Sequence, residues 1–423
     1  MQHLLSASAI AAVLVMAVPA GVLASEALPG ASLPALLELA KAGNPEYASM
    51  RFEAQAAVER VVPAGALPDP KFRTEWMDIT KMGEQSPTLL PAKVGSTRYT
   101  LMQDLPWFGK RDLKRDIARF DAQGSEGKAL GSWLELASKI KTLQAQRHYL
   151  RGNEQLTQEI IDLMGRLEQV AQSRYAGGLA AQQDVIRAQV EQTVMRNELV
   201  MIESERQQVD ARLNALLARP AQAALAPPER LRPLPLPAQL DYAKLEQRVR
   251  DRNPQLFIEE ARIQAAEKSR DLTLKNRYPD FTLSITPTQT QTTVKEWGLM
   301  LEVNIPLQQS SRRAMEREAE AMLGAARSRK EAAANQVLAE LTQNLTAVEA
   351  ARHTEVLATR SLLPQADLTF NSAMASYENG KLEFANLLDA QRQIRQAKQS
   401  QIKAQLEGQM RLAEIEKLLG EDL

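Results

Sequence analysis

Two segments of the chain alternate apolar residues with other residues at a period of two, which is the pattern of β-strands that bury one face. The first runs from Phe281 to Ile285 and the second from Trp297 to Ile305. The polar stretch 288–293 between them predicts an exposed loop, so the region 281–305 is predicted to form a β-hairpin. A less regular pair of segments predicts another hairpin at 72–105.

Other long stretches have the spacing of helices. No proline occurs between Pro106 and Pro220, and apolar residues spaced alternately by 4 and 3 predict a coiled-coil seam. The seam is predicted to consist of Leu156, Ile160, Leu163, Leu167 and Val170 on one helix and of Val190, Val194, Asn197 and Met201 on the returning helix. At ~1.5 Å per residue, Asp112 to Arg174 would form an arm on the order of 95 Å long. Pro364 is predicted to kink the corresponding second arm.

Short motifs recur along the chain at offsets of about 200 to 211 residues, which indicates a tandem duplication. Asn44-Pro45 recurs as Asn253-Pro254, Pro68-Asp69 as Pro279-Asp280, Pro106 as Pro306, and Tyr175-Ala176-Gly177-Gly178 as Tyr377-Glu378-Asn379-Gly380. Each repeat is predicted to contain a short helix, a β-hairpin and a long helical hairpin. The segments 175–180 and 377–382 are predicted as the hairpin tips, because glycine and asparagine tolerate positive φ at a helix C-terminus.

The repeats are predicted to span 25–218 and 241–423, joined by a proline-rich connector at 219–240 that should be extended and stiff. Residues 1–24 are predicted to be a signal peptide, because an apolar run precedes small residues that favour cleavage after Ala24. The alternative is a membrane-anchoring helix, since the stretch 4–23 is just long enough to span.

Composition argues against several classes of function. The 52 Lys and Arg residues balance 52 Asp and Glu residues, so the chain has no electrostatic reason to bind nucleic acid. It has no cysteine, its three histidines lie far apart, and its 14 methionines are scattered. No nucleophile-elbow, zinc-protease or phosphate-loop motif occurs. The sequence therefore predicts that the protein is not an enzyme and that it holds neither a cofactor nor a metal site.

Apart from residues 1–24, no stretch approaches the roughly 18 uncharged apolar residues that a spanning helix requires. An exported chain of this kind is soluble or crosses a membrane as a barrel. Trp76, Trp107 and Trp297 lie in or beside the predicted hairpins, as rings at a membrane interface do, although half-buried positions in a soluble sheet remain an alternative. Because four strands cannot close a barrel, several copies would have to pool them.

In the order and duplication of these motifs, the chain resembles the TolC-type outer-membrane efflux proteins. The resemblance covers nearly all of the chain after the signal peptide and rests on the two tips, on Asp184-Val185, and on the segments 362–366 and 388–391. The segment 106–111 resembles the branch that serves heavy-metal pumps. The resemblance implies a homotrimer whose chains share a twelve-stranded barrel above an α-helical periplasmic tunnel. The chain would be a passive duct in the bacterial outer membrane that extends into the periplasm and works with a periplasmic adaptor and an inner-membrane RND-type pump.

The resemblance also implies a gate near the second tip. Tyr377 and Asp184 correspond to a latch that holds the tunnel closed. The alternatives are that Asp184 is a charge favoured at a helix N-terminus and that Tyr377 is a packing residue beside a turn. Asn386 and Asp389 correspond to an inner ring of acids, of which only Asp389 is acidic here. Leu382 replaces the arginine of the family's latch, so either a hydrogen-bonded or an apolar closure is expected.

The tips would be the contact with the adaptor. The residues expected there are Tyr175, Gly177, Gly178, Leu179, Gly380 and Lys381. Basic clusters at 110–115 and 312–313 suit contact with outer-membrane lipid headgroups and equally suit solvated helix starts.

Two other classes of protein are alternatives to a duct. A secreted or periplasmic coiled-coil scaffold or adhesin explains the helices and leaves the alternating hairpins without a role. A periplasmic hydrolase requires a set of catalytic residues that the motifs do not supply.

Overall fold

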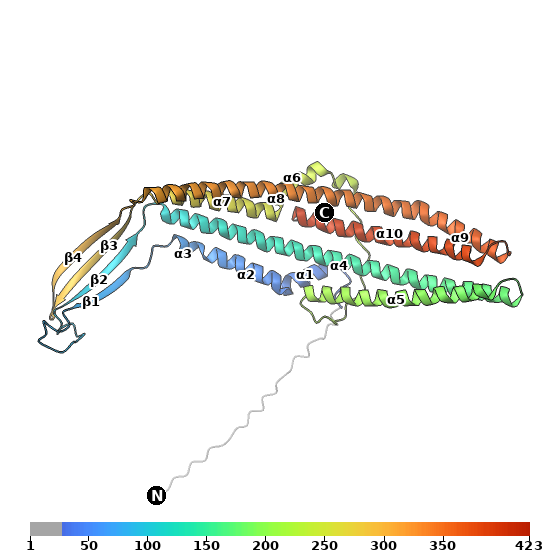
Figure 1. The fold of residues 1–423 in the computed structure, drawn as a ribbon, viewed down its shortest axis with the longest axis horizontal. Helices are drawn as coiled ribbons and strands as arrows, with labels where there is room; N and C mark the ends of the chain where they lie inside the picture. The colour runs from blue at the N-terminus through green and yellow to red at the C-terminus, as the bar shows by residue number, and fades with distance from the viewer. Residues whose placement is uncertain (1–27) are drawn as a thin grey trace, which may run out of the picture.

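The computed structural model describes residues 28–423, so the predicted signal peptide lies outside the described residues. Long helices run side by side along a curved rod, and a β-sheet continues it at one end (Figure 1). The first repeat contains α1 (Leu33–Gly43), α2 (Pro45–Glu59), α3 (Val61–Gly65), β1 (Lys71–Met77), β2 (Ser96–Leu105), α4 (Lys110–Ala176) and α5 (Gln182–Leu216). The second contains α6 (Tyr242–Arg252), α7 (Pro254–Lys275), β3 (Asp280–Thr290), β4 (Thr293–Asn304), α8 (Gln309–Leu357), α9 (Leu363–Glu378) and α10 (Phe384–Leu419). The mainly helical, duplicated fold with four strands is confirmed.

The recurring Asn-Pro motifs have the same task in both repeats. Each asparagine ends one helix and caps the next, where the following proline occupies the first turn. The Asn44 side chain accepts a hydrogen bond from the backbone of α2 and donates one of 2.9 Å to the carbonyl of Leu216. Asn253 donates a bond of the same length to the carbonyl of Leu418. Each motif therefore ties its short helices to the far end of the long helical hairpin.

The four strands form one antiparallel sheet in the order β1-β2-β3-β4, so the two hairpins join at β2 and β3. The predicted loop 288–293 is too long: β3 extends to Thr290 and β4 begins at Thr293, with an irregularity in the pairing at Thr288 and Gln289. Strands continue through this polar segment because alternating threonine and glutamine also suit a pleated sheet. Among residues 28–423, no helix has both the length and the apolarity needed to span a membrane.

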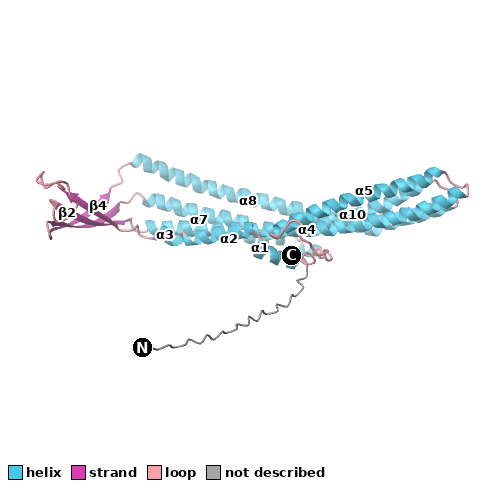
Figure 2. Ribbon diagram, turned by 90° about the horizontal axis from the view of Figure 1, so that it is seen from below, coloured by secondary structure: helices cyan, strands magenta, loops and turns pink. Residues whose placement is uncertain are grey.

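The central helix α4 contacts α5 and α10 toward the tips and α7 toward the sheet, while α8 packs on α7 and α10 (Figure 2). Near the tips, α4, α5, α9 and α10 contribute to one apolar core, which we call the tip core. At mid-length, separate cores form around α1, α4 and α5 and around α6, α8 and α10. The chain is therefore ordered across the rod as α5, α4, α10 and then α8 with α9.

The predicted coiled-coil seam is correct on α4 and wrong on α5. Leu156, Ile160 and Leu167 are buried, whereas Val190, Val194, Asn197 and Met201 are all exposed. The buried residues of α5 include Ala188, Gln192, Met195, Ile202, Val209 and Leu213. These residues also follow a heptad spacing, with steps of 4, 3, 7, 7 and 4 residues. The seam includes the small Ala188 and the polar Gln192, which a search for large apolar side chains passes over.

The second arm is interrupted where Pro364 was expected to disturb it. Residues Ala358–Leu362 form a π-helical turn between α8 and α9, and Pro364 lies in the first turn of α9. A proline there lacks the N–H that a continuous α-helix would use, so the extra residue of the π turn accommodates the break without ending the rod.

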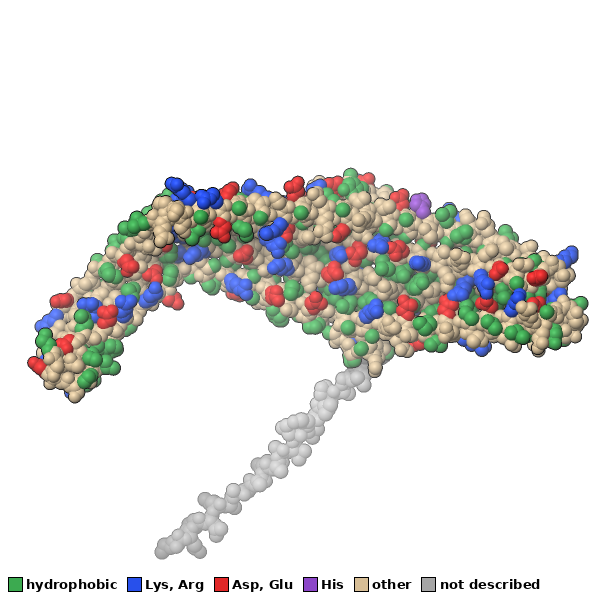
Figure 3. Space-filling model, viewed as in Figure 1, with side chains coloured by type: hydrophobic (Ala, Val, Ile, Leu, Met, Phe, Trp, Pro, Cys, Tyr) green, Lys and Arg blue, Asp and Glu red, His purple; other side chains and the backbone are tan. Residues whose placement is uncertain are grey.

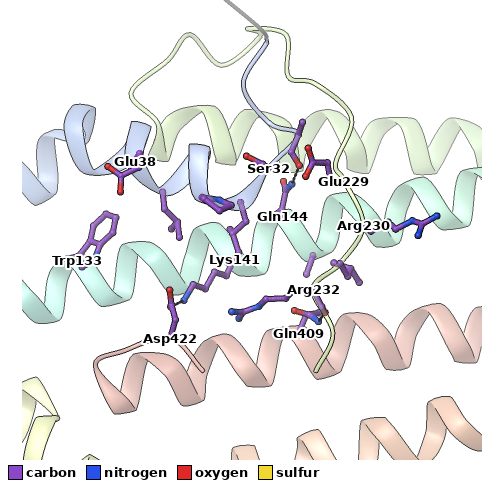
Figure 4. Close-up of a pocket in the computed structure, with 16 residues that line it drawn as sticks. Ser32, Glu38, Trp133, Lys141, Gln144, Glu229, Arg230, Arg232, Gln409 and Asp422 are labelled. Atoms are coloured by element: carbon purple, nitrogen blue, oxygen red, sulfur yellow. Dashed lines mark hydrogen bonds and ion pairs between the residues drawn. The ribbon is translucent and has the colours of Figure 1, made fainter. Parts of the chain in front are cut away.

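The connector 219–240 crosses the rod and is fixed by buried charges. Glu416, only 1% exposed, accepts hydrogen bonds from Arg232 at 2.6 and 2.7 Å and from Lys141 at 2.8 Å. Lys141 also pairs with Asp422 beside a hollow of about 510 Å³ (Figure 4). Because each buried charge has partners of opposite sign, the pairs fix the connector against α4 and α10.

Candidate functional site

Both helical hairpins reverse through the same backbone turn. In each turn, the N–H of the glycine, Gly178 or Gly380, donates a hydrogen bond of 2.9 Å to a carbonyl three residues earlier. The N–H of the next residue donates a hydrogen bond of 2.8 Å to a carbonyl five residues earlier. Gly178 and Gly380 supply the left-handed conformation, with φ of 71° and 69°. Gly177 has a φ of −81° and does not use positive φ. The duplication thus extends to the hydrogen bonds of the tips.

The structure brings Tyr377 and Asp184 together although they are 193 residues apart. The Tyr377 hydroxyl donates a hydrogen bond of 3.3 Å to the Asp184 carboxylate, linking α9 to the first turn of α5. Tyr377 is 2% exposed and its ring packs against Phe384 with centroids 5.3 Å apart. Burial, and then the charge of Asp184, raise the pKa of Tyr377 to about 12, so the phenol stays protonated and able to donate.

Arg174 is a third member of this contact that the sequence analysis missed. Its guanidinium lies over the Tyr377 ring, 5.0 Å from the centroid. It donates to the carbonyl of Glu378 and, at 3.1 Å, to that of Leu179, so it joins the two tips. An arginine in the last turn of a helix is common because it offsets the helix dipole, and this sequence pattern therefore carried no distinct signal.

The other predicted gate residues lie nearby without joining this contact. Asn386 is exposed in the first turn of α10, and Leu382 is half-buried against the tip core. Asp389 is exposed and pairs with Arg392 on its own helix at 3.2 Å. Sequence reasoning therefore located these residues at one end of the molecule, but the structure groups only Tyr377 and Asp184.

Two further ion pairs join α10 to α5 and were not predicted. Arg392 pairs with Glu191, and Arg395 pairs with Glu198, which lies seven residues farther from the tip along α5. The hydrogen bond to Glu191 is the main reason why the pKa of Arg392 is raised. Together with the Tyr377 contact, these pairs hold the second helical hairpin against α5 over about four turns of that helix.

The predicted docking residues lie at the end of the rod. Tyr175 is 46% exposed and Leu179 is 70% exposed, and neither side chain packs into the tip core. Gly177, Gly178, Gly380 and Lys381 are also exposed. A Cβ at Gly178 would meet nothing within 4 Å, so the first tip leaves open space beside an apolar side chain.

A rod of duplicated helical hairpins that ends in an antiparallel sheet is the architecture of one class of outer-membrane protein. The model of the family "Outer membrane efflux protein" matches this chain twice, over residues 36–219 and 245–421. The chain therefore belongs to the outer membrane efflux protein family and is an outer-membrane protein whose helices extend into the periplasm.

Particular relatives agree with this assignment. The chain is 24% identical over 374 residues to the cobalt-zinc-cadmium resistance protein CzcC of Cupriavidus metallidurans, covering 87% of this chain and 84% of that protein. Its fold is similar to that of CusC, with a TM-score of 0.79, 16% identity and 92% of each chain covered. It is also similar to VceC from Vibrio cholerae, with a TM-score of 0.78, 17% identity, and coverage of 92% of this chain and 96% of that one.

Proposed function

We propose that the protein is the outer-membrane exit duct of a tripartite efflux system and acts as a homotrimer. The observation that carries the proposal is a four-stranded sheet with two open edges, β1 and β4, at the end of a duplicated helical rod. The edge strand β4 is exposed along its whole length and carries Trp297, Leu299 and Leu301. In lipid, open edges leave backbone groups unpaired, so three chains would pool their strands in a twelve-stranded barrel.

The helical part has the length that a tunnel across the periplasm requires. Helix α4 alone has 67 residues, which corresponds to about 100 Å at 1.5 Å per residue. On the face of the rod shown in Figure 3, charged side chains of both signs are scattered rather than gathered in one patch. Three such rods would enclose a passive conduit, through which cargo moves without catalysis by this chain.

The latch of Tyr377 and Asp184 is proposed to hold the periplasmic end closed. Its support is the hydrogen bond between α9 and α5, reinforced by Arg174 and by the ion pairs of Arg392 and Arg395. Each of these contacts joins the second helical hairpin to the first one. Loss of all of them would free the second hairpin to move outward, and this movement would open the tunnel.

The tips are proposed to receive the periplasmic adaptor, which in turn connects to an inner-membrane RND-type pump. The support is the exposed apolar side chain of Leu179 next to Tyr175, where a helical hairpin of the adaptor would pack. Contact with outer-membrane lipid is assigned to the sheet. Of the basic clusters, Lys110, Arg111 and Arg312 already bond to protein groups, so they are poor candidates for lipid headgroups.

The proposed cargo is a heavy-metal cation. The support is the similarity to a cobalt-zinc-cadmium resistance protein over most of both chains. Threefold symmetry would bring three Asp389 side chains toward one axis, where their charges favour the passage of cations. Arg392, three residues farther along the same helix, neutralises part of this charge in each chain.

Two measurements test the proposed duct. Membrane fractionation should recover the protein as an oligomer that detergent extracts from the outer membrane, and electron microscopy of that oligomer should show threefold symmetry and a helical tunnel. A soluble protein without threefold symmetry would support the coiled-coil scaffold instead. For the cargo, deletion of the gene should lower tolerance to zinc, cobalt or cadmium, and unchanged tolerance to all three would exclude this substrate class.

A further inference from the structure

The place where the two repeats meet inside one chain shows how neighbouring β-hairpins are held at the base of the sheet. Asp280, the first residue of β3, accepts a hydrogen bond of 2.7 Å from the backbone N–H of Trp107, just after β2. It also accepts one of 2.8 Å from the ammonium of Lys110, which donates a second bond of 3.0 Å to the carbonyl of Tyr278. We call this contact the internal junction.

Apolar side chains complete the internal junction. The Trp107 ring stacks on Tyr278 with centroids 5.1 Å apart and lies 5.7 Å from the ring of Phe281. The Lys110 side chain beneath them is 5% exposed. The Trp107 ring, which follows β2, thus inserts between Tyr278 and Phe281, which lie on either side of Asp280 at the start of β3.

The duplication assigns each member of this contact a counterpart in the other repeat. The Pro-Asp motifs align Asp69 with Asp280, so Leu67 corresponds to Tyr278 and Pro70 to Phe281. The prolines after β2 and β4 align Leu307 with Trp107. One equivalent hydrogen bond in each repeat supports this alignment. Arg111 donates to the carbonyl of Gly65, and Arg312 donates to that of Asn276, the residue that corresponds to Gly65.

Within residues 28–423, these counterparts have no partners of their own. The carboxylate of Asp69 takes part in no hydrogen bond or ion pair, and the side chain of Leu307 is 80% exposed. Leu67 and Pro70 are exposed as well. They lie at the two outer edges of the sheet, Leu307 after β4 and the other three before β1, where one chain cannot bring them together.

We propose that these residues form the same junction between two copies of the chain. Asp69 of one copy accepts a hydrogen bond from the backbone N–H of Leu307 in the neighbouring copy, and the Leu307 side chain packs between Leu67 and Pro70. The inference rests on the proposed homotrimer and specifies how its chains meet where β4 pairs with β1. Only a second copy fits, because the complementary groups are all in this chain.

The junction between copies differs from the internal junction in two respects, the ammonium group and the aromatic side chains. The segment from Pro306 to Arg312 is one residue longer than that from Pro106 to Arg111, and Ser311 occupies the place of Lys110. No ammonium therefore reaches Asp69. The aspartate is neutralised less well and the aromatic stack is replaced by smaller side chains, so the seam between copies is the weaker one.

The test is disulfide cross-linking of the full-length protein, which contains no cysteine of its own. Asp69→Cys combined with Leu307→Cys, oxidised with diamide in outer membranes, should give bands at two and three times the chain mass on a non-reducing denaturing gel. The matched control, Trp107→Cys with Asp280→Cys, should lose its free thiols while remaining at the mass of one chain. Asp69→Cys with Gln291→Cys, which lies at the opposite end of the sheet, should not cross-link.

The outcomes separate this inference from the proposed function. If amine cross-linking shows a trimer and the 69–307 pair forms no disulfide, the junction is wrong and the duct stands. If no trimer is found by either method, both are wrong.

A gain-of-stability variant provides a second test: Ser311→Lys should raise the temperature at which the trimer dissociates in detergent, and Asp69→Ala should abolish that gain. An equal gain in the presence of Asp69→Ala would contradict the contact.

Discussion

The two tips of this protein share one backbone and differ in where their side chains lie. Tyr175 and Tyr377 occupy the same place in the two repeats, yet the first is largely exposed and the second is buried and hydrogen-bonded to Asp184. Seven residues farther on, Gln182 is exposed at the start of α5, whereas Phe384 is 1% exposed at the start of α10. The two repeats therefore have equal turns, one with its tyrosine buried and the other with its tyrosine exposed.

This difference teaches that the shape and the role of a tip are separable. Glycine and the backbone hydrogen bonds determine the turn in both repeats. The neighbouring side chains determine whether that turn is held by the rest of the chain, as at the second tip, or is free for a partner, as at the first. The proposed latch and the proposed docking surface are therefore two outcomes of one ancestral hairpin.

The largest contrast is expected from removal of the aromatic side chain that only the second tip buries. Phe384→Ala leaves a cavity in the tip core and should cost about 3–5 kcal/mol of local stability. Gln182→Ala at the corresponding exposed position should change it by less than about 0.5 kcal/mol. Hydrogen exchange of the tip amides, followed by mass spectrometry, measures both. Equal loss of protection in the two variants would show that the tips are not packed differently.

A smaller contrast is expected at the tip glycines. Gly178→Val and Gly380→Val both place a β-branched residue in the left-handed region, at a cost of about 1–2 kcal/mol. Gly380→Val should cost more, because its Cβ would approach Arg174 Nη2 to 3.2 Å, whereas Gly178→Val meets open space.

Gly177→Ala serves as the control, since its φ of −81° suits any residue and a Cβ there meets no atom closer than 3.6 Å. Cross-linking to the adaptor should fall for both valine variants while the trimer persists. Undiminished cross-linking in both would show that the adaptor docks elsewhere.

The hydroxyl of Tyr377 should matter while that of Tyr175 should not. Tyr377→Phe removes a hydrogen bond to a half-buried carboxylate and should cost about 0.5–1.5 kcal/mol per chain. Tyr175→Phe breaks no hydrogen bond within the described residues and should have no measurable effect. The temperature at which the second hairpin dissociates, followed by the fluorescence of a probe on Lys381→Cys, compares the two variants. An equal fall of that temperature in both variants would contradict this prediction.

The pH dependence of the latch follows from the raised pKa of Tyr377. A phenol whose pKa rises from 10.0 to about 12 on folding contributes stability that is fully present below pH 10 and is lost as the pH rises through 12. The absorbance of ionised tyrosine should therefore show a late step near pH 12 that Tyr377→Phe lacks. If the two titration curves coincide, Tyr377 is not held as described.

Much of this molecule was predictable because its elements obey local rules. Period-two alternation located β3 and β4, and the recurring glycine turns located both tips. The family's motif singled out Tyr377 and Asp184 together, and the structure shows a hydrogen bond between them. These features depend on residues close in sequence or on a motif that the duplication repeats.

The parts that sequence reasoning missed depend on which face of a helix meets a neighbour. Val190 and Val194 look like core residues, yet Ala188 and Met195 are the ones that face α4, because a small residue lets the two helices approach closely. Arg174 was missed for a related reason. Its partners, the Tyr377 ring and the Glu378 carbonyl, come from the other repeat and cannot be inferred from its own helix.

The measurement that tests the account most directly is the single-channel conductance of the purified protein in planar bilayers. The wild type should conduct weakly if, as we propose, Tyr377 and Asp184 hold the second hairpin inward. Tyr377→Phe combined with Asp184→Ala removes the bond in each chain, and losses of about 0.5–1.5 kcal/mol in three chains should shift the population measurably toward an open, highly conducting state. Tyr175→Phe should leave the conductance low. An unchanged small conductance in the double variant, with the trimer intact, would contradict the claim that these two residues hold the duct closed.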